Sequence, residues 1–279
     1  GMYFDADGNM KFYDNETDNY VQNHFQLHWS EKWSNQWTSN LALHYTRGKG
    51  YFEQYKEDET LADYYLPNFG GNSISDLVRK RWLDNDFYGA TFSLNYKTIK
   101  TDIMLGGAAN RYLGNHFAEV VWTPYYKPNN NRYYDNIGNK EDVSFYTKAS
   151  HDITSKLNIF ADLQYRMVFY QANSVKFSDV NDTFRFFNPK AGLNYQFNKK
   201  NSFYGYFGIA NKEPRRDDYE NGSINPERLF DYELGWKYNT SNVKVSANAF
   251  YMKYQNQLVM TGALNDVGSP IFTNIDWET

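Results

Sequence analysis

The stretch that most constrains this fold, residues 87–97, alternates apolar and polar side chains along its length. Its apolar set begins and ends with a tyrosine and comprises Tyr88, Ala90, Phe92, Leu94 and Tyr96. Because successive side chains of a β-strand point to opposite faces, the pattern predicts a strand with one apolar and one largely polar face. A strand of about ten residues whose apolar row is bounded by aromatic residues is typical of a membrane-spanning strand. A soluble β-sandwich strand shows the same alternation, so the rest of the chain decides between the two.

The same alternation recurs along the chain, in pairs of long strands joined by short polar turns. The turns are predicted at residues 30–36, 98–99, 152–156, 198–201 and 239–242, after a small hairpin over residues 3–13. Longer polar segments are predicted as loops between the pairs, at residues 47–83, 112–142, 171–182, 211–226 and 255–269, with a further strand from Ile271. Short turns at one end and long loops at the other are typical of outer-membrane barrels, with the turns periplasmic and the loops extracellular.

We therefore predict an all-β fold, an antiparallel up-and-down transmembrane β-barrel present in part, as about ten to eleven strands of a larger barrel. Residues 1–279 are predicted to form a single domain, because no linker or shift in composition divides them. The sequence begins Gly1-Met2-Tyr3 without a charged and apolar leader. We interpret Gly1 as left by tag removal, and we expect a signal peptide to have been cleaved or left out.

The composition agrees with this fold and excludes several others. Aromatic residues make up 19% of the chain, which favours strands, and no run of about twenty apolar residues is present for a helical span. The mean hydropathy of -0.80 is compatible with a barrel, because half of each strand faces a polar lumen. A net charge of -4 without a basic patch argues against nucleic acid as a partner. The absence of cysteine excludes disulfides, thiolate metal sites and cysteine nucleophiles.

Two pairs of motifs in the second half of the chain carry a resemblance to a known family. The first is Phe-Asn-Pro-Lys-Ala-Gly-Leu-Asn-Tyr at residues 187–195 with Tyr-Gly-Tyr-Phe-Gly-Ile-Ala-Asn-Lys-Glu-Pro-Arg at residues 204–215. The second is Asn-Pro-Glu-Arg-Leu-Phe-Asp-Tyr-Glu-Leu-Gly-Trp-Lys at residues 225–237 with Ala-Asn-Ala-Phe-Tyr-Met-Lys-Tyr-Gln-Asn at residues 247–256. These motifs resemble the barrel of TonB-dependent outer-membrane receptors, especially those of the Bacteroidetes. The first half of the chain resembles that family in architecture only.

The resemblance implies a receptor in the outer membrane of a Gram-negative bacterium, with a barrel of about 22 strands whose lumen is closed by a plug. Such a receptor captures a nutrient at its extracellular loops and imports it when the inner-membrane TonB complex pulls on the plug. The implied partners are outer-membrane lipid, the TonB complex and a surface lipoprotein, and the ligand is a glycan, siderophore, cobalamin or peptide. By this resemblance we expect the chain to be a fragment of a longer receptor, without the plug domain, the TonB-contacting box and the C-terminal strands, and we expect its open edge strands to allow self-association.

The loops that the pattern predicts contain an unusual number of tyrosines, together with two adjacent arginines. The candidate ligand-binding residues are Tyr51, Tyr55, Tyr64, Tyr65, Tyr125, Tyr126, Tyr133, Tyr134, Arg215 and Arg216. Exposed aromatic rings stack on a sugar, a porphyrin-like ring or a siderophore, and arginines bind anionic groups. The alternatives are that the tyrosines pack the loops together or extend the aromatic girdle, and that the arginines are solvated.

No catalytic arrangement, cofactor site or metal site is predicted. His24 and His28 have the best spacing for a shared metal, but four residues along a strand separate them by about 13 Å. We therefore expect a binding protein and not an enzyme. Two other classes stay open at this point: a passive porin-like or adhesive barrel without a plug, and a soluble all-β carbohydrate-binding module with strands of about five or six residues.

Glycines mark two positions in the predicted strands. Gly235 lies between Glu233 and Lys237 on the lumenal face, where it is expected to permit close approach by a plug or a neighbouring strand. Gly106 and Gly107, followed by two alanines, blur the alternation in their strand, and the sequence alone accounts for them only as close packing.

Overall fold

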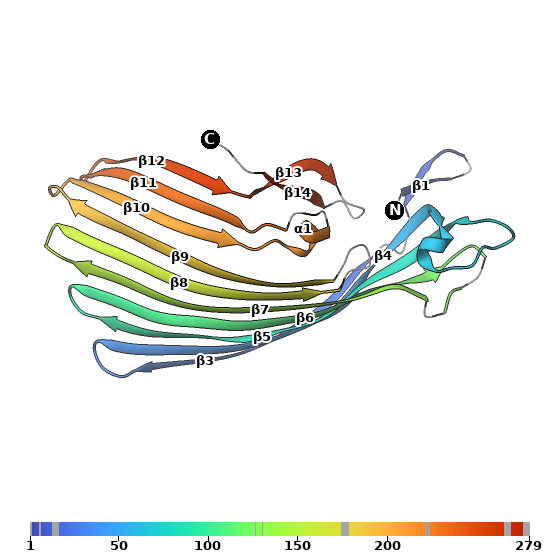
Figure 1. Cartoon of the computed structure of the whole chain (residues 1–279), viewed down its shortest axis with the longest axis horizontal. Coiled ribbons are helices and arrows are strands. Elements are labelled where there is room, and N and C mark those ends of the chain that lie inside the picture. The colour runs from blue at the N-terminus through green and yellow to red at the C-terminus, as the bar shows by residue number, and fades with distance from the viewer. Residues whose placement is uncertain are drawn as a thin grey trace.

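The chain forms a curved, open antiparallel sheet of ten strands, seen in a computed structural model (Figure 1). The structure describes residues 2–5, 7–12, 17–125, 127–129, 131–173, 179–220, 222, 224–264 and 269–275. The strands of the sheet are β3 (Asp18–Lys32), β4 (Trp37–Thr60), β5 (Ile74–Lys97), β6 (Thr101–Trp122), β7 (Asn131–Asp152), β8 (Leu157–Ala172), β9 (Val180–Gln196), β10 (Asn201–Lys212), β11 (Glu227–Asn239) and β12 (Lys244–Gln255). Each strand pairs with its neighbours in sequence, from β3 at one edge to β12 at the other, which confirms the predicted up-and-down topology of a partial barrel.

The connections at one end of the sheet are short, as predicted, and all lie at the left of Figure 1. Their first turns are held by hydroxyl groups: the backbone N–H of Trp37 donates to Ser34, and that of Thr101 donates to Thr98. Side-chain hydrogen bonds of this kind stabilise a chain reversal, which explains why serine and threonine stand there.

The predicted loops at residues 47–83 and 112–142 are wrong in extent, because most of these residues form strands. β4 and β5 continue together to Thr60 and Ile74, and β6 and β7 pair up to Val120 and Asn131. Apolar residues of these extensions stand next to one another, as Leu77 does with Val78 and Phe117 with Ala118, so the alternation that identified the other strands is missing from them. Cross-strand pairs stabilise them instead, such as Lys80 with Glu53 at 3.4 Å.

One continuous row of apolar side chains, formed by register partners, crosses the outer face of the sheet. It consists of Trp37, Tyr96, Ile103, Ala149, Ala161, Ala191, Phe207, Tyr232 and Tyr251. The next row of register pairs lies on the opposite face and contains Lys148, Asp162, Lys190 and Asp231. The two faces therefore differ in polarity as the sequence predicted, with the apolar face outward and the polar face toward the lumen.

Aromatic rings from neighbouring strands cover the glycines that the sequence left unexplained. A side chain at Gly106 would meet the ring of Tyr146 on the polar face, and one at Gly107 would meet the rings of Phe92 and Phe145 on the apolar face. Glycine lets these rings lie flat against the backbone, a pairing that compensates for the weak strand propensity of glycine itself.

The ends of the extended hairpins carry a small hydrophobic core of their own. The short 3-10 helix η1 (Leu61–Tyr64) follows β4 and folds back over β5 and β6. The cluster consists of Leu61, Tyr64, Leu66, Leu77 and Val120, with Tyr133 packed against it. This core fixes the far ends of β4 to β7.

Four short strands lie outside the main sheet. β1 (Met2–Phe4) and β2 (Met10–Phe12) form the predicted N-terminal hairpin, and β13 (Gln257–Leu264) pairs with β14 (Pro270–Ile275). The predicted eleventh barrel strand is therefore wrong, because β14 pairs with β13 and not with β12. The chain leaves the sheet at Asn256, whose positive φ of 51° turns it away, and the Asn274 amide holds this bend through the Asn256 carbonyl at 2.9 Å.

The remaining helix is α1 (Arg216–Glu220), between β10 and β11. Within the described parts of the chain, no helix has the length and apolar character needed to cross a membrane.

Candidate functional site

Two of the predicted binding tyrosines, Tyr51 and Tyr55, lie in strand β4 and not in a loop. The Tyr51 ring packs on Trp82 of β5, with centroids 4.5 Å apart, and the ammonium of Lys80 lies 4.2 Å from its centre. The Tyr55 hydroxyl donates to Asp76 at 2.6 Å. Both tyrosines lie on the outward face of β4, and their partners on that face are residues of the neighbouring strand β5.

Tyr64, Tyr133 and Tyr134 come together on the inner side of the extended hairpins. The rings of Tyr64 and Tyr133 are 4.7 Å apart, and those of Tyr133 and Tyr134 are 5.3 Å apart. Arg79 donates to the Tyr64 hydroxyl at 3.4 Å, and Arg81 donates to the Tyr134 hydroxyl at 3.1 Å. Burial raises the pKa of Tyr133 to about 12, so this phenol stays protonated at physiological pH. The cluster packs these hairpins together, and Tyr64, only 4% exposed, is part of its core.

The other loop tyrosines are more accessible. Tyr65 has a positive φ of 54° and is 69% exposed, directly after the buried Tyr64. Tyr125 stacks on Phe69 with centroids 4.8 Å apart and accepts a hydrogen bond from Asn72 at 3.3 Å. Tyr126 lies outside the described residues. Tyr65 and Tyr125 are thus the predicted tyrosines whose surfaces a ligand reaches most directly.

The predicted arginines belong to the segment around α1. The Arg215 guanidinium pairs with Asp218, Nε to Oδ2 at 3.4 Å, and lies 4.6 Å from the ring centre of Phe272 on β14. The backbone N–H of Arg215 also donates to the same carboxylate at 2.8 Å. Arg216 begins α1. The pairing with Asp218 makes Arg215 a structural residue of this turn.

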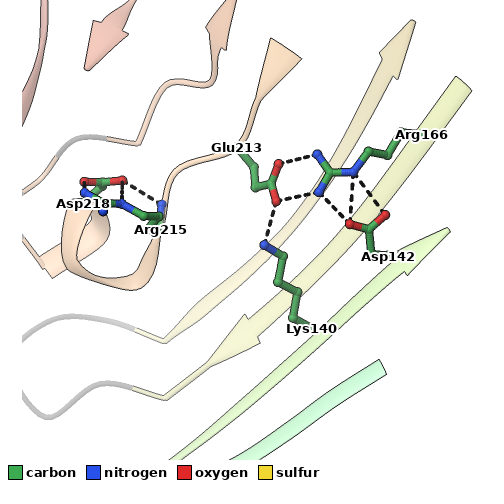
Figure 2. Close-up of polar contacts among 6 residues, drawn as sticks. All are labelled: Lys140, Asp142, Arg166, Glu213, Arg215 and Asp218. Carbon is green, nitrogen blue, oxygen red and sulfur yellow. Dashed lines mark hydrogen bonds and ion pairs between the residues drawn. The ribbon is translucent and has the colours of Figure 1, made fainter. Parts of the chain in front are cut away.

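The residue that fixes this segment is Glu213, which the sequence did not single out (Figure 2). Its carboxylate accepts hydrogen bonds from Arg166 at 2.8 and 2.9 Å and from Lys140 at 2.6 Å. Arg166 also donates to Asp142 of β7, at 2.6 to 3.1 Å, and so joins two carboxylates. Burial alone would raise the pKa of the Glu213 carboxyl, but the hydrogen bonds from Arg166 and Lys140 lower it to about 2.

A second contact holds the same segment to β8 and β9. The Tyr219 hydroxyl donates to Asp182 of β9 at 2.6 Å, and its ring lies 5.5 Å from that of Tyr170 on β8. The segment from Glu213 to Tyr219, here named the anchored segment, is therefore tied to β7, β8 and β9 across the polar face. The anchored segment therefore lies on the lumenal side of the sheet, near the ends of these strands.

The polar face also contains a hollow over β8 to β11, with a volume of about 470 Å³. Its lining includes Phe160, Tyr204, Tyr206, Asp231 and Glu233. Gly235, on the same face, has its side-chain space filled by the Tyr204 ring, so the close approach expected there comes from the neighbouring strand. Among the described residues no cluster of histidine and acidic side chains is suited to a metal ion, and His24 hydrogen bonds to Thr46 at 3.0 Å.

A curved antiparallel sheet with an apolar outer face, a polar inner face and short turns at one end is part of an outer-membrane β-barrel. The family model of the TonB dependent receptor-like β-barrel matches residues 2–276. The chain therefore belongs to this family, whose barrels lie in the Gram-negative outer membrane. No curated protein sequence matches the chain significantly.

Solved structures with the same fold are import receptors and transporters. The ferric-catecholate import receptor Fiu from K12 E. coli, in its closed form, shares 10% identity over 93% of this chain and 44% of its own, with a TM-score of 0.57. The copper transporter OprC shares 12% identity over 92% of this chain and 42% of its own, with a TM-score of 0.68. The ferripyoverdine receptor of Pseudomonas aeruginosa shares 16% identity over 98% of this chain and 40% of its own, with a TM-score of 0.59. At such identities the likeness shows the fold alone, and the chain spans less than half the length of each protein.

Proposed function

We propose that this chain is part of the wall of a TonB-dependent transporter that imports a nutrient across the outer membrane. The observation that carries the proposal is the apolar row from Trp37 to Tyr251, which continues in register across nine strands and faces away from a charged inner row. Such a division suits a wall between lipid and a polar passage. It does not suit a soluble sheet, whose apolar face packs on a second layer.

In this proposal the extended hairpins and the anchored segment form the outer mouth of the passage. Tyr65 and Tyr125 present aromatic surface for first contact with a ligand, and Tyr133, Tyr134 and Arg81 form the packed inner side of the same hairpins. The related structures are a ferric-catecholate import receptor, a copper transporter and a receptor bound to ferripyoverdine. For this chain we infer a glycan, siderophore, cobalamin or peptide as the class of ligand.

The proposed transporter is a longer receptor of the Bacteroidetes type, as the motifs at residues 187–195 and 225–237 suggest. The share of the related receptors that the chain spans supports this, because the remaining strands and a plug would lie in the rest of such a receptor. Its proposed partners are the TonB complex, which acts on the plug, and a surface lipoprotein at the outer mouth. Energy coupling belongs to the plug and not to residues of this chain.

Deletion of the encoding gene in its native host tests the proposal. The deletion strain is grown on defined media that supply iron as a ferric siderophore, cobalamin, a peptide or a glycan as the limiting nutrient. We expect growth to fail on one of these media and to return when the wild-type gene is restored. Deletion of tonB should cause the same failure. Growth that depends on the gene but not on TonB would identify a passive barrel and overturn the proposal.

A further inference from the structure

The hollow on the polar face of β8 to β11 has the size and lining of a ligand subsite. Its volume of about 470 Å³ falls within the range of small-molecule sites, about 300 to 1,000 Å³. Aromatic, amide, acidic and basic side chains line it together. The lining residues used below are Phe160, Tyr204, Tyr206, Asp231, Glu233 and Lys237.

Two parallel aromatic rings meet at the centre of this hollow. Phe160 on β8 and Tyr206 on β10 are both register partners of Gly192 on β9. Their ring planes differ by 3° and their centroids are 6.3 Å apart. A side chain at residue 192 would meet Phe160 ring carbons at 3.0 and 3.1 Å, so glycine is what allows this ring to lie there. Phe160 interrupts the polar residues Asn158, Asp162, Gln164 and Arg166 on the inward face of β8, so it does not belong to the outward apolar row.

The polar groups beside these rings need hydrogen-bond donors. Among the residues that the structure describes, Asp231 Oδ1 is buried without a hydrogen-bond partner, and Glu233 accepts one long bond, 3.4 Å from the Tyr204 hydroxyl. A buried carboxylate oxygen without a donor is costly, and Asp231 also lines the hollow, so its carboxylate is a group that an incoming donor would stabilise. Lys237 lies 5.5 Å from the centre of the Tyr204 ring and forms no ion pair with either carboxylate in the described chain.

The charge of the hollow selects among ligands. Asp231 and Glu233 against Lys237 give a net charge of -1, so the site repels anions such as phosphates and carboxylates. A purely apolar ligand would leave the Asp231 oxygen without a donor. A neutral polyhydroxylated ring satisfies both demands, because its C–H face packs on aromatic rings and its hydroxyl groups donate to carboxylates.

We propose that this hollow is a subsite for a neutral saccharide on the lumenal wall, with Phe160 and Tyr206 as the stacking surface and Asp231 and Glu233 as hydroxyl acceptors. The inference deepens the proposed function, on which it rests, by naming a glycan as the ligand and β8 to β11 as a place on its path. It concerns the wall of the passage and is separate from the tyrosines at the outer mouth.

Saturation-transfer NMR on the complete chain in detergent micelles tests the subsite. The probes are maltose, cellobiose and lactose, each at millimolar concentration. We expect transfer to the ring C–H protons of at least one disaccharide, and a loss of affinity of about tenfold or more for Phe160→Ala. The matched control is Phe203→Ala, an exposed aromatic on the outward face of β10, which should bind the sugar as the wild type does.

Two further measurements make the outcome unambiguous. Asp231→Asn keeps the shape of the side chain and removes its charge, and it should weaken binding several-fold, with an unchanged circular dichroism spectrum as evidence of folding. Glucose and glucosamine are compared because glucosamine carries an ammonium group. Tenfold tighter binding of glucosamine would identify an ammonium site and overturn the saccharide assignment. Absence of transfer to every probe, or equal binding by Phe160→Ala, would also overturn it.

The failure of this inference is distinguishable from failure of the transport proposal. If gene deletion abolishes TonB-dependent growth on a siderophore and no sugar binds the chain, the subsite is wrong and the transporter stands. If the sugars bind the hollow and growth never depends on TonB, the subsite stands and the transport proposal is wrong.

Discussion

The Tyr204 ring on β10 fills the space that a side chain at Gly235 on β11 would occupy. The two residues are direct register partners on the polar face, so the ring lies flat over its neighbour's backbone. Tyr146 and Gly106 have the same relationship on β7 and β6. The rings therefore seal the inner surface of the sheet at positions where glycine leaves the backbone uncovered.

Gly235→Ala is expected to destabilise the sheet, because the added methyl group forces the Tyr204 ring out of its position. Overpacking of this kind costs about 1 to 3 kcal/mol. The loss should appear as a lower urea midpoint for unfolding of the chain in detergent micelles. In a Tyr204→Ala background the same glycine change should cost less than in the wild type, since the ring that it displaces is gone.

Gly205→Ala is the matched control for this prediction. A side chain at Gly205 would meet only Leu234, at an ordinary contact distance of 3.5 Å. Its urea midpoint should stay close to that of the wild type. Equal destabilisation by both alanines would mean that strand propensity or backbone freedom, and not the Tyr204 ring, determines the cost.

The fold was predictable where apolar and polar residues alternate and unpredictable where apolar residues fall on both faces of a strand. Leu41 and Phe92 sit in strands that the alternation identified, and the structure pairs them directly. Glu53 and Lys80 also face one another across strands, but the apolar residues near them, such as Leu77 and Val78, are adjacent in sequence and give no alternation. The separate β13–β14 hairpin was missed because its departure from the sheet depends on one backbone angle at Asn256, which no apolar pattern records.

Leu41→Arg is expected to impair insertion of the sheet into lipid. Leu41 lies midway between Trp37 and Tyr45 among the outward-facing residues of β4. A lipid-facing arginine at the bilayer midplane costs about 2 to 4 kcal/mol. Ala42→Arg, one residue along the same strand, places the charge on the lumenal face and should be far better tolerated. The measurement is the folded fraction after dilution from urea into phosphatidylcholine vesicles. Equal losses for the two variants would contradict the assignment of the faces.

Tyr64→Phe is expected to loosen the core at the ends of the extended hairpins. Its hydroxyl accepts from the buried Arg79 and donates to Glu59 at 2.7 Å, so its removal leaves both groups without this link. Loss of such hydrogen bonds to charged groups costs about 1.5 to 3 kcal/mol. Hydrogen exchange of the residue 61–66 amides should accelerate accordingly. Tyr65→Phe is the control, because Tyr65 is exposed, and exchange there should not change.

The candidate site was only partly predictable, because its strongest contacts join residues far apart in sequence. Glu213 meets Arg166 and Lys140, which precede it by 47 and 73 residues. Lys140 and Asp142 were assigned to a loop, so no register was available to place them beside Arg166. One feature of the sequence pointed to this site: Arg166 falls on the polar, inward face of β8. A charged residue there is expected to pair with an acidic residue.

Glu213→Gln is expected to release the anchored segment from the wall, since the amide removes the negative charge that holds Arg166 and Lys140. The pH dependence has a definite sign. Because the folded-state pKa is lowered to about 2, the carboxylate stabilises docking above its ordinary pKa of about 4.3 and loses this effect as pH falls toward 2. Pepsin cleavage near α1, expressed relative to cleavage of an unstructured peptide at the same pH, should therefore accelerate on acidification in the wild type and already be fast at pH 5 in the variant.

Lys140→Met separates the contributions of the two cations to this anchor. It removes the 2.6 Å bond to Glu213 but leaves both bonds from Arg166, so the segment should stay docked with an intermediate rate of cleavage. Glu31→Gln, on the exposed edge strand β3, serves as a control for the general effect of losing a carboxylate. Cleavage that is insensitive to pH in the wild type would mean that Tyr219 and Asp182, and not Glu213, hold the segment. In that case Tyr219→Phe, which removes the 2.6 Å bond to Asp182, should produce the fast cleavage expected of Glu213→Gln.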